Sequence, residues 1–290
     1  MNTRTVSVED GRALEVAEYG PAHGYPVLYM HGAPSSGREW SVIGDDGLLE
    51  DLGLRLIAPT RPGMGASDFA PGRTISGIKS DVDAIRAAFA IDQFALLGYS
   101  GGCAYAVAAA TALTDQVSAL ALVAPVIHAD AAMTAGLDPS GLKMKELVRK
   151  HPLIGRFLLY LAMGLPARSA PDTLKKQILK ALPPSDVEAL SEQGRLDAFV
   201  SLLRDAFAAG ARGPRLDMAL MTSPWDFEMR KLDLPVAIFQ GEEDTFGARP
   251  AMAYYLAQRL GTDDLQILAD GHISIATRHM RQILTRLVPR

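Results

Sequence analysis

Short, continuous runs of apolar residues alternate along this chain with longer stretches of helical periodicity. The runs lie at residues 26–30, 54–59, 94–97 and 117–124. A continuous run predicts a strand buried on both faces, as in a parallel sheet covered by helices. Residues 76–90 instead repeat their apolar side chains at helical intervals, and residues 103–113 are rich in alanine. The pattern therefore predicts an α/β fold.

The two ends of the chain add further strands. Alternating apolar residues in Thr5–Val8 and Ala13–Tyr19, separated by an Asp-Gly pair, predict an antiparallel hairpin. Near the C-terminus, strands are predicted at residues 235–239 and 265–268, and helices at 250–260 and 273–287. These C-terminal strands and the strands before residue 128 can belong to one sheet.

Residues 128–225 contain no convincing strand pattern. Helical periodicity recurs at residues 155–165, 173–182 and 195–209, and prolines interrupt it repeatedly. Because proline ends or bends a helix, this segment predicts short helices joined by bends. We therefore predict a core built from residues 1–127 and 226–290, with a helical lid at residues 128–225 inserted between the two parts.

Charge and composition narrow the class of partner. The chain has 29 Lys and Arg against 33 Asp and Glu, a net charge of −4 without long blocks. This charge pattern predicts no basic surface that would bind nucleic acid or an anionic membrane, so we expect a small-molecule partner. A single cysteine, Cys103, allows no internal disulfide or thiolate metal site, and we expect no metal and no cofactor. The polar N-terminus and the lack of a membrane-spanning run predict a cytoplasmic protein; the oligomeric state stays open.

A nucleophile motif lies at residues 98–102, Gly-Tyr-Ser-Gly-Gly, which match G-x-S-x-G. The motif follows a predicted strand and precedes a predicted helix, the context that a nucleophile elbow requires. Glycines at 98 and 102 suit a tight turn in which side chains would strike the neighbouring strand and helix. Since short Gly and Ser patterns also arise by chance, this context carries the prediction that Ser100 is a nucleophile.

A serine nucleophile requires a base and usually an acid, in the chain order Ser, acid, His. His272 follows the last predicted strand and can reach the same sheet edge as Ser100, so we predict it as the base. Asp244 follows strand 235–239 and is the predicted acid, with Asp270 as the alternative. The other histidines at 23, 151 and 279 are expected to be solvated or structural.

Backbone amides can stabilise the oxyanion of an acyl-transfer intermediate. The segment Met30-His31-Gly32-Ala33-Pro34 ends the first central strand at the edge where Ser100 lies. We predict that the amides of Ala33 and Gly101 form the oxyanion hole and that His31 anchors this loop.

These motifs together resemble the α/β-hydrolase superfamily. The resemblance rests on the loop at 31–34, the segment Arg61-Pro62-Gly63-Met64-Gly65-Ala66-Ser67, the nucleophile turn, Asp244 and Gly271-His272. It spans nearly all of the chain apart from the lid, and it implies an eight-stranded, mostly parallel sheet with helices on both faces and a lid after the sixth strand. Thr60 departs from the pattern, since many relatives have Asp there.

Ser100 separates this chain from the epoxide hydrolase and haloalkane dehalogenase branches, which use an aspartate nucleophile. We predict hydrolysis of a small or medium apolar ester or lactone through an acyl-enzyme, while thioester, amide and carbon–carbon bonds remain open. One alternative is a lyase, cyclase or cofactor-free oxygenase that uses Ser100 and His272 for acid–base chemistry. Another is a ligand-binding protein without turnover.

The lid is rich in Leu, Met, Phe and Ala, which indicates an apolar substrate pocket. As substrate-binding residues we predict His31, Tyr99, His128, Phe157, Met163 and Phe246. For each lid side chain the alternative is packing between helices.

Overall fold

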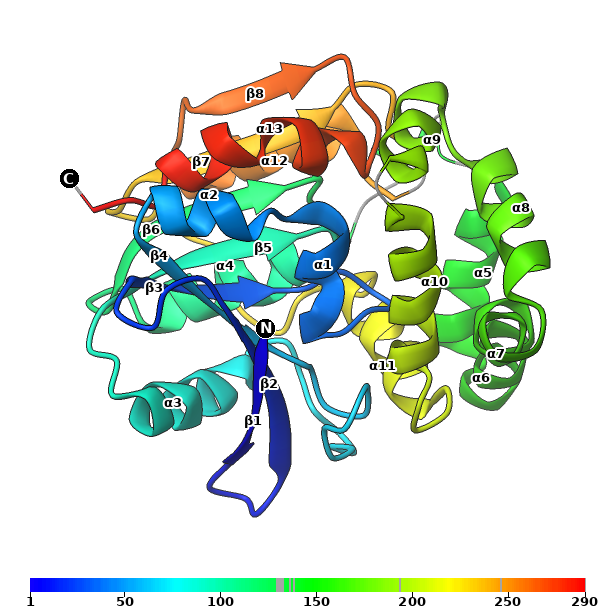
Figure 1. Ribbon diagram of the computed structural model, residues 1–290, viewed down its shortest axis with the longest axis horizontal. Helices are drawn as coiled ribbons and strands as arrows, with labels where there is room; N and C mark the ends of the chain where they lie inside the picture. The colour runs from blue at the N-terminus through cyan, green and yellow to red at the C-terminus, as the bar shows by residue number, and fades with distance from the viewer. Residues whose placement is uncertain (129–132, 136, 138, 193, 246, 290) are drawn as a thin grey trace.

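The computed structural model describes residues 1–128, 133–135, 137, 139–192, 194–245 and 247–289. Its strands are β1 (Asn2–Ser7), β2 (Ala13–Tyr19), β3 (Tyr25–Met30), β4 (Leu54–Pro59), β5 (Phe94–Tyr99), β6 (Val117–Val123), β7 (Val236–Gly241) and β8 (Leu265–Leu268). They form an eight-stranded sheet in the order β1-β2-β4-β3-β5-β6-β7-β8 (Figure 1). β2 pairs antiparallel with β1 and β4, and all other pairs are parallel. The predicted mostly parallel sheet is confirmed.

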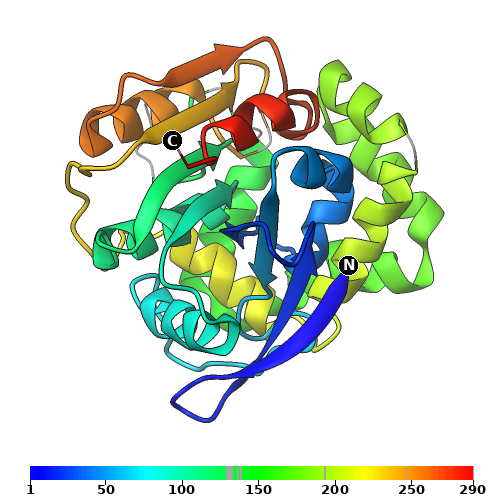
Figure 2. The same cartoon turned by 60° about the vertical axis from the view of Figure 1, so that its left-hand side comes forward.

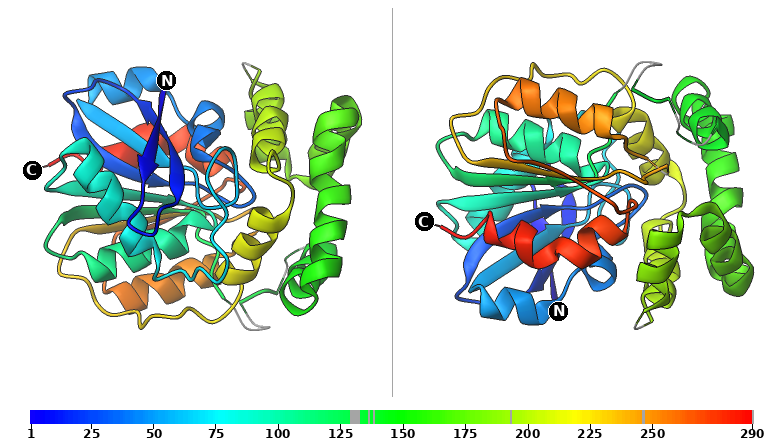
Figure 3. Two further views of the ribbon diagram at one scale, coloured as in Figure 1. Left: turned by 90° about the horizontal axis from the view of Figure 1, so that it is seen from below. Right: turned by 90° about the horizontal axis from the view of Figure 1, so that it is seen from above.

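The two faces of the sheet bury different side chains, because neighbours along a strand point to opposite sides. In β5, Leu96 packs toward α3 (Ile78–Phe89), α4 (Gly102–Ala112) and α12 (Pro250–Leu260). Leu97 packs on the opposite face, toward α1 (Trp40–Ile43), α2 (Asp46–Asp51) and α13 (Ser274–Thr285). Figure 3 shows helices on both faces of the sheet. The apolar runs are continuous because both faces are covered.

Two short helices between β3 and β4 were not predicted. α1 has four residues and α2 has six, so neither is long enough to show a helical period. Asp45 caps α2 by accepting a hydrogen bond from the amide of Gly47 at 2.8 Å. The predicted antiparallel pair forms as the β1–β2 hairpin, and it stands at one edge of the sheet (Figure 2).

Between β6 and β7 the described elements are helices, which lie within residues 139–221, and we call these residues the cap. Its elements are α5 (Pro139–Lys150), α6 (Pro152–Leu159), the π-helical turn η2 (Tyr160–Gly164), α7 (Leu165–Ser169), α8 (Pro171–Ala181), α9 (Pro184–Ser191), α10 (Arg195–Ala206) and α11 (Arg212–Met221). The cap lies beyond the carboxyl ends of the strands (Figure 1), inside the segment predicted as a lid. None of the helices in the described part of the chain has the length and apolar character of a membrane span.

Candidate active site

The carboxyl end of β5 carries Ser100 on a tight turn into α4. Ser100 has a φ of +54°, a conformation that residues with a side chain rarely adopt. Its amide donates to the carbonyl oxygen of Val123 at 2.8 Å. A Cβ atom on Gly102 would lie 1.9 Å from the carbonyl oxygen of Met30, so only glycine fits beside the neighbouring strand. The turn is therefore built as the sequence motif predicts.

Ser100, His272 and Asp244 form a continuous chain of hydrogen bonds. Nε2 of His272 lies 2.9 Å from Oγ of Ser100, and Nδ1 lies 2.6 Å from Oδ2 of Asp244. Asp244 is fully buried, and its Oδ1 accepts a hydrogen bond from the amide of Gly247 at 3.1 Å. The three predicted residues come from the ends of β5, β7 and β8, which meet at one edge of the sheet.

Asp270, the alternative acid, has other partners. Its carboxylate bonds Arg278 at 2.9 Å and His279 at 2.8 Å, both on α13. The structure therefore brings Asp244, and not Asp270, to the ring of His272.

The pKa of His272 follows from this geometry. Burial by itself would lower the pKa, but the negative charge and hydrogen bond of Asp244 outweigh burial and raise it above the usual value for histidine. A proton on Nδ1 donates to Asp244 and leaves the lone pair of Nε2 toward the hydroxyl of Ser100. The arrangement suits a general base for Ser100.

The loop after β3 brings Ala33 next to the start of α4. A Cβ atom on Gly101 would lie 3.3 Å from the Cβ of Ala33, so the two predicted oxyanion-hole residues are neighbours. The buried carboxylate of Glu39 accepts a hydrogen bond from the amide of Gly32 at 2.7 Å and fixes this loop. Burial raises the pKa of Glu39. Sequence reasoning missed Glu39, because a single acidic residue before a tryptophan matches no motif.

A cavity of about 230 Å³ includes Ser100 and His272 in its wall. Its cap side is formed mainly by apolar side chains, from Ala162, Met163, Leu174, Gln177, Ile178, Ala181, Leu182, Phe199 and Leu203. Of the residues predicted to bind substrate, Tyr99 and Met163 line this cavity. Tyr99 also donates a hydrogen bond to the carbonyl oxygen of His272 at 3.1 Å. Phe246 lies outside the described residues.

Three predicted substrate-binding residues lie elsewhere. His31 is fully buried, and its Nε2 accepts a hydrogen bond from the amide of Arg61 at 3.0 Å, which fits the predicted role of loop anchor. Burial and the charge of Arg61 hold the pKa of His31 well below its usual value. His128 is exposed and bonds the carbonyl oxygen of Thr222 at 2.8 Å. Phe157 is 62% exposed, because the face of α6 that carries it points to solvent.

Comparison with known proteins supplies the family. Residues 25–278 match the family model of the alpha/beta hydrolase fold. The chain belongs to this family. It is 27% identical to lipase LipV of Mycobacterium tuberculosis over 259 residues, which cover 89% of this chain and 87% of that protein. It is 31% identical to a non-heme chloroperoxidase of Streptomyces lividans over 145 residues, 49% of this chain and 50% of that protein.

A solved structure confirms the fold of this α/β hydrolase. The esterase RhEst1 from Rhodococcus sp. ECU1013 matches it with a TM-score of 0.67 and 21% sequence identity, over 98% of this chain and 97% of that one. At that identity the likeness shows the shared fold alone.

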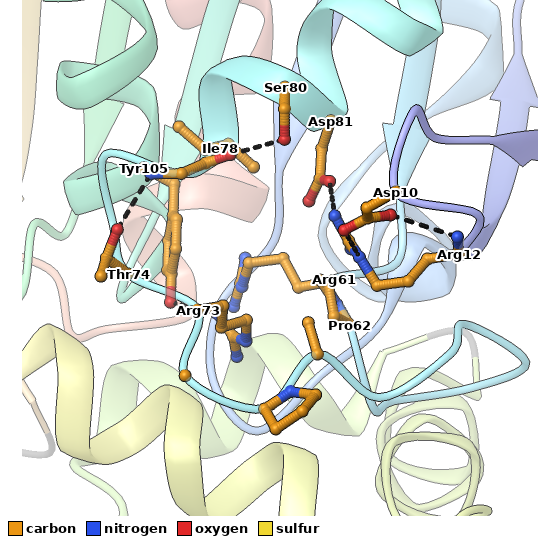
Figure 4. Close-up of a pocket in the computed structure, with 14 residues that line it drawn as sticks. Asp10, Arg12, Arg61, Pro62, Arg73, Thr74, Ile78, Ser80, Asp81 and Tyr105 are labelled. Atoms are coloured by element: carbon orange, nitrogen blue, oxygen red, sulfur yellow. Dashed lines mark hydrogen bonds and ion pairs between the residues drawn. The ribbon is translucent and has the colours of Figure 1, made fainter.

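The cap of this α/β hydrolase is fastened to the core by a buried ion cluster. Asp217 on α11 has no exposed surface and accepts hydrogen bonds at 2.7 Å from each of Arg61, Arg73 and Tyr105. These three partners also border a second cavity of about 290 Å³ (Figure 4). Burial alone would raise the pKa of Asp217, but the two arginines hold it well below its usual value. Arg61 also donates to the carbonyl oxygens of residues 31–32, which connects the cap to the loop after β3.

A second cap carboxylate reaches the loop that carries His272. Asp186 in α9 is fully buried and accepts backbone hydrogen bonds from His272 and Ile273 at 2.9 Å and from Ser274 at 2.8 Å. These amides begin α13, where the helix dipole favours a negative charge. A Cβ atom on Gly271 would lie 2.3 Å from Asp186, so glycine permits the approach. We infer that the cap helps to position His272.

Sequence reasoning missed both cap carboxylates. In the sequence, Asp186 follows Pro-Pro-Ser and has the character of an ordinary acidic residue in a first helical turn. Its partners lie 86 to 88 positions away, and the distance from Asp217 to Arg61 is 156 positions. The sequence feature that could have indicated such a contact is Gly271, because a glycine next to His272 leaves room for a side chain from another part of the chain.

We expect Asp186→Asn to lower kcat and to move the acid limb of the pH profile to lower pH. Asparagine places an NH₂ group against a backbone N–H donor, and leaving that buried donor without an acceptor costs about 1–3 kcal/mol of free energy. It also removes a negative charge that, together with Asp244, raises the pKa of His272. Because the base must be neutral, activity is lost as the pH falls through this pKa, and a lower pKa extends activity to lower pH. Profiles of kcat/KM against pH measure the shift.

The matched control is Glu188→Gln on the same helix. Glu188 is exposed and bonds Arg278 at 2.5 Å, so this variant is expected to leave both the rate and the profile unchanged. A drop in kcat for Asp186→Asn with an unmoved acid limb would restrict Asp186 to a structural role.

Proposed function

We propose that this α/β hydrolase cleaves carboxylic esters or lactones with small or medium apolar acyl groups, through an acyl-enzyme intermediate. The observation that carries the proposal is the hydrogen-bonded chain from Asp244 through His272 to Ser100, at the wall of a cavity with apolar cap residues. The likeness to lipase LipV supports the same class of reaction.

The proposed reaction has two symmetrical halves. Oγ of Ser100 attacks the acyl carbon while Nε2 of His272 takes its proton, and the carboxylate of Asp244 stabilises the imidazolium. The amides of Ala33 and Gly101 bind the oxyanion. His272 then gives its proton to the leaving alcohol. Water attacks the acyl-enzyme in the same way, which releases the acid and restores the hydroxyl of Ser100.

A series of p-nitrophenyl esters of increasing acyl length tests the proposal. Each methylene that enters the apolar cavity can add up to about 0.8 kcal/mol of binding, until the cavity is filled. Because the cavity holds about 230 Å³, we expect kcat/KM to peak at short or medium acyl chains and to fall at least about tenfold for palmitate. Turnover of no ester in the series and of no lactone of similar size would contradict the proposal.

A pair of neighbouring substitutions checks that this cavity holds the acyl chain. Ile178 lines the cavity, whereas Leu179, next to it on α8 and similarly half-buried, does not. Ile178→Ala is expected to move the optimum to longer chains, and Leu179→Ala to leave it in place. Equal shifts in both variants would place the acyl chain elsewhere.

A non-hydrolytic reaction is the second candidate. The relative from Streptomyces lividans is named a chloroperoxidase and not an esterase. Proteins with this degree of sequence similarity can therefore catalyse different reactions. Covalent labelling of Ser100 by a fluorophosphonate probe, together with no turnover of esters or lactones, would favour a lyase, cyclase or cofactor-free oxygenase that uses Ser100 and His272 as acid–base groups.

A further inference from the structure

The outer side of the cap exposes large apolar side chains. α6, η2 and α7 follow one another directly as a helical segment from Pro152 to Ser169. Six of its side chains are 36% to 74% exposed, and we call them the apolar stripe: Leu153, Ile154, Phe157, Leu158, Leu161 and Leu165. Elsewhere in the described residues, the large hydrophobic side chains exposed to this degree are Met1 and Tyr254.

The same helical segment is also apolar on its inner side. Gly155, Leu159 and Ala167 are buried, and α6 packs against α5 and α11. Figure 3 shows the green helices of the cap, which include α5 and α6, on the side of the cap that faces away from the sheet. A helix that is apolar on both sides is normally covered on both sides, and a contiguous exposed apolar surface marks an interaction site.

The charge around the apolar stripe identifies its partner. Residues 139–170 contain six Lys and Arg and one acidic residue, Glu146, a net charge of +5. Since the whole chain carries −4, the other residues together carry −9. Lys143, Arg149, Lys150 and Arg156 are exposed. Within the described residues, the one ion pair that these four side chains form joins Lys150 to Glu146 at 2.6 Å. An apolar helical face bordered by Lys and Arg is the pattern of a helix that lies in the plane of an anionic lipid surface.

We propose that the apolar stripe docks on an anionic lipid bilayer, with its Leu, Ile and Phe side chains below the headgroups and the neighbouring Lys and Arg against the phosphates. A second copy of the chain is a poorer partner, because two stripes would bring two charges of +5 together. Ala162 and Met163 of the same helical segment line the catalytic cavity, so the bilayer would lie beside it. The proposal replaces the expectation of no membrane partner and does not depend on the proposed reaction.

Vesicle flotation tests the proposal with the 290-residue chain that carries Ser100→Ala, which cannot hydrolyse the lipid through Ser100. We expect the protein to float with vesicles of phosphatidylcholine and phosphatidylglycerol at low salt, and far less with phosphatidylcholine alone. Added salt should weaken the binding, because it screens the phosphates from Lys and Arg.

Two pairs of variants separate apolar from ionic contributions. Ile154→Ser with Phe157→Ser should lower the partition coefficient at least tenfold, since each buried side chain contributes about 1.5–3 kcal/mol. Arg149→Gln and Arg156→Gln should each lower it about fivefold, from about 1 kcal/mol per charge. The matched controls on the core are Tyr254→Ser, 58% exposed on α12, and Arg281→Gln on α13, which should bind as before. Thermal melting verifies that every variant is folded.

Three outcomes would overturn the proposal: no flotation with anionic vesicles, equal flotation by the stripe variants and their controls, or equal binding to both kinds of vesicle. Light scattering adds an independent check. A dimer that Phe157→Ser dissociates would assign the apolar stripe to a second copy of the chain.

Discussion

Replacing Ser100 with alanine is expected to lower kcat for ester hydrolysis at least about 1000-fold and to abolish labelling by a fluorophosphonate probe. The reason is that Oγ of Ser100 lies 2.9 Å from Nε2 of His272 and is the atom that would become acylated. Intact-mass measurement of the labelled protein checks the adduct. Ser223→Ala is a suitable control, because Ser223 bonds the carbonyl oxygen of Ala219 and lies outside the hydrogen-bonded chain.

His272→Ala should cost about as much as Ser100→Ala, and the double variant little more than either. Residues that act as one unit give losses that do not add, because removal of one member already disables the others. Losses that multiply in the double variant, or an adduct that survives Ser100→Ala, would show that Ser100 and His272 do not form a nucleophile and base pair.

Replacing Asp217 with alanine is expected to destabilise the fold by about 3–5 kcal/mol, because it leaves two buried arginines without their carboxylate. Arg61 is 1% exposed and Arg73 is 8% exposed, so water does not replace the lost partner. A loss of this size lowers the midpoint of thermal unfolding by roughly 5–15 °C. Calorimetry or circular dichroism measures it.

The matched control is Asp51→Ala at the surface. Asp51 pairs with Arg281 at 2.7 Å, but both side chains are about 60% exposed. Such pairs contribute at most about 1 kcal/mol, so the midpoint should hardly move. If both variants lost the same stability, the buried cluster would contribute no more than a surface ion pair.

The sheet could be predicted from the sequence because its signals are local. The run at 54–59 becomes β4 and the run at 265–268 becomes β8 with the predicted bounds. In β4, burial on both faces leaves Arg55 as the one charged residue, whereas β8 lies at the edge of the sheet and is half-buried. The positions of Ser100, Asp244 and His272 followed for the same reason. Each comes after a predicted strand, and parallel strands end at one edge of the sheet.

The cap could not be predicted to the same depth, because its contacts join distant parts of the chain. Apolar residues on both sides of α6 gave no indication of which side faces the cavity, so Phe157 was assigned to the pocket although it points to solvent. Met163, on the following turn of the same helical segment, does line the cavity. The net charge of the whole chain also concealed the basic character of residues 139–170, because the positive charge of this segment is cancelled in the sum by the negative charge of the other residues.

The two cap carboxylates divide the cap into a fixed part and an adjustable part. Asp186 and Asp217 anchor α9 and α11, whereas most of the cavity's cap-side wall comes from η2, α8 and α10. A rigid-body hinge of the entire cap would break both anchors and release the loops that hold His272 and Ala33. If the proposed function holds, changes of substrate range are expected to accumulate between residues 152 and 181, because substitutions there leave Asp186, Asp217 and the loops that they hold unchanged.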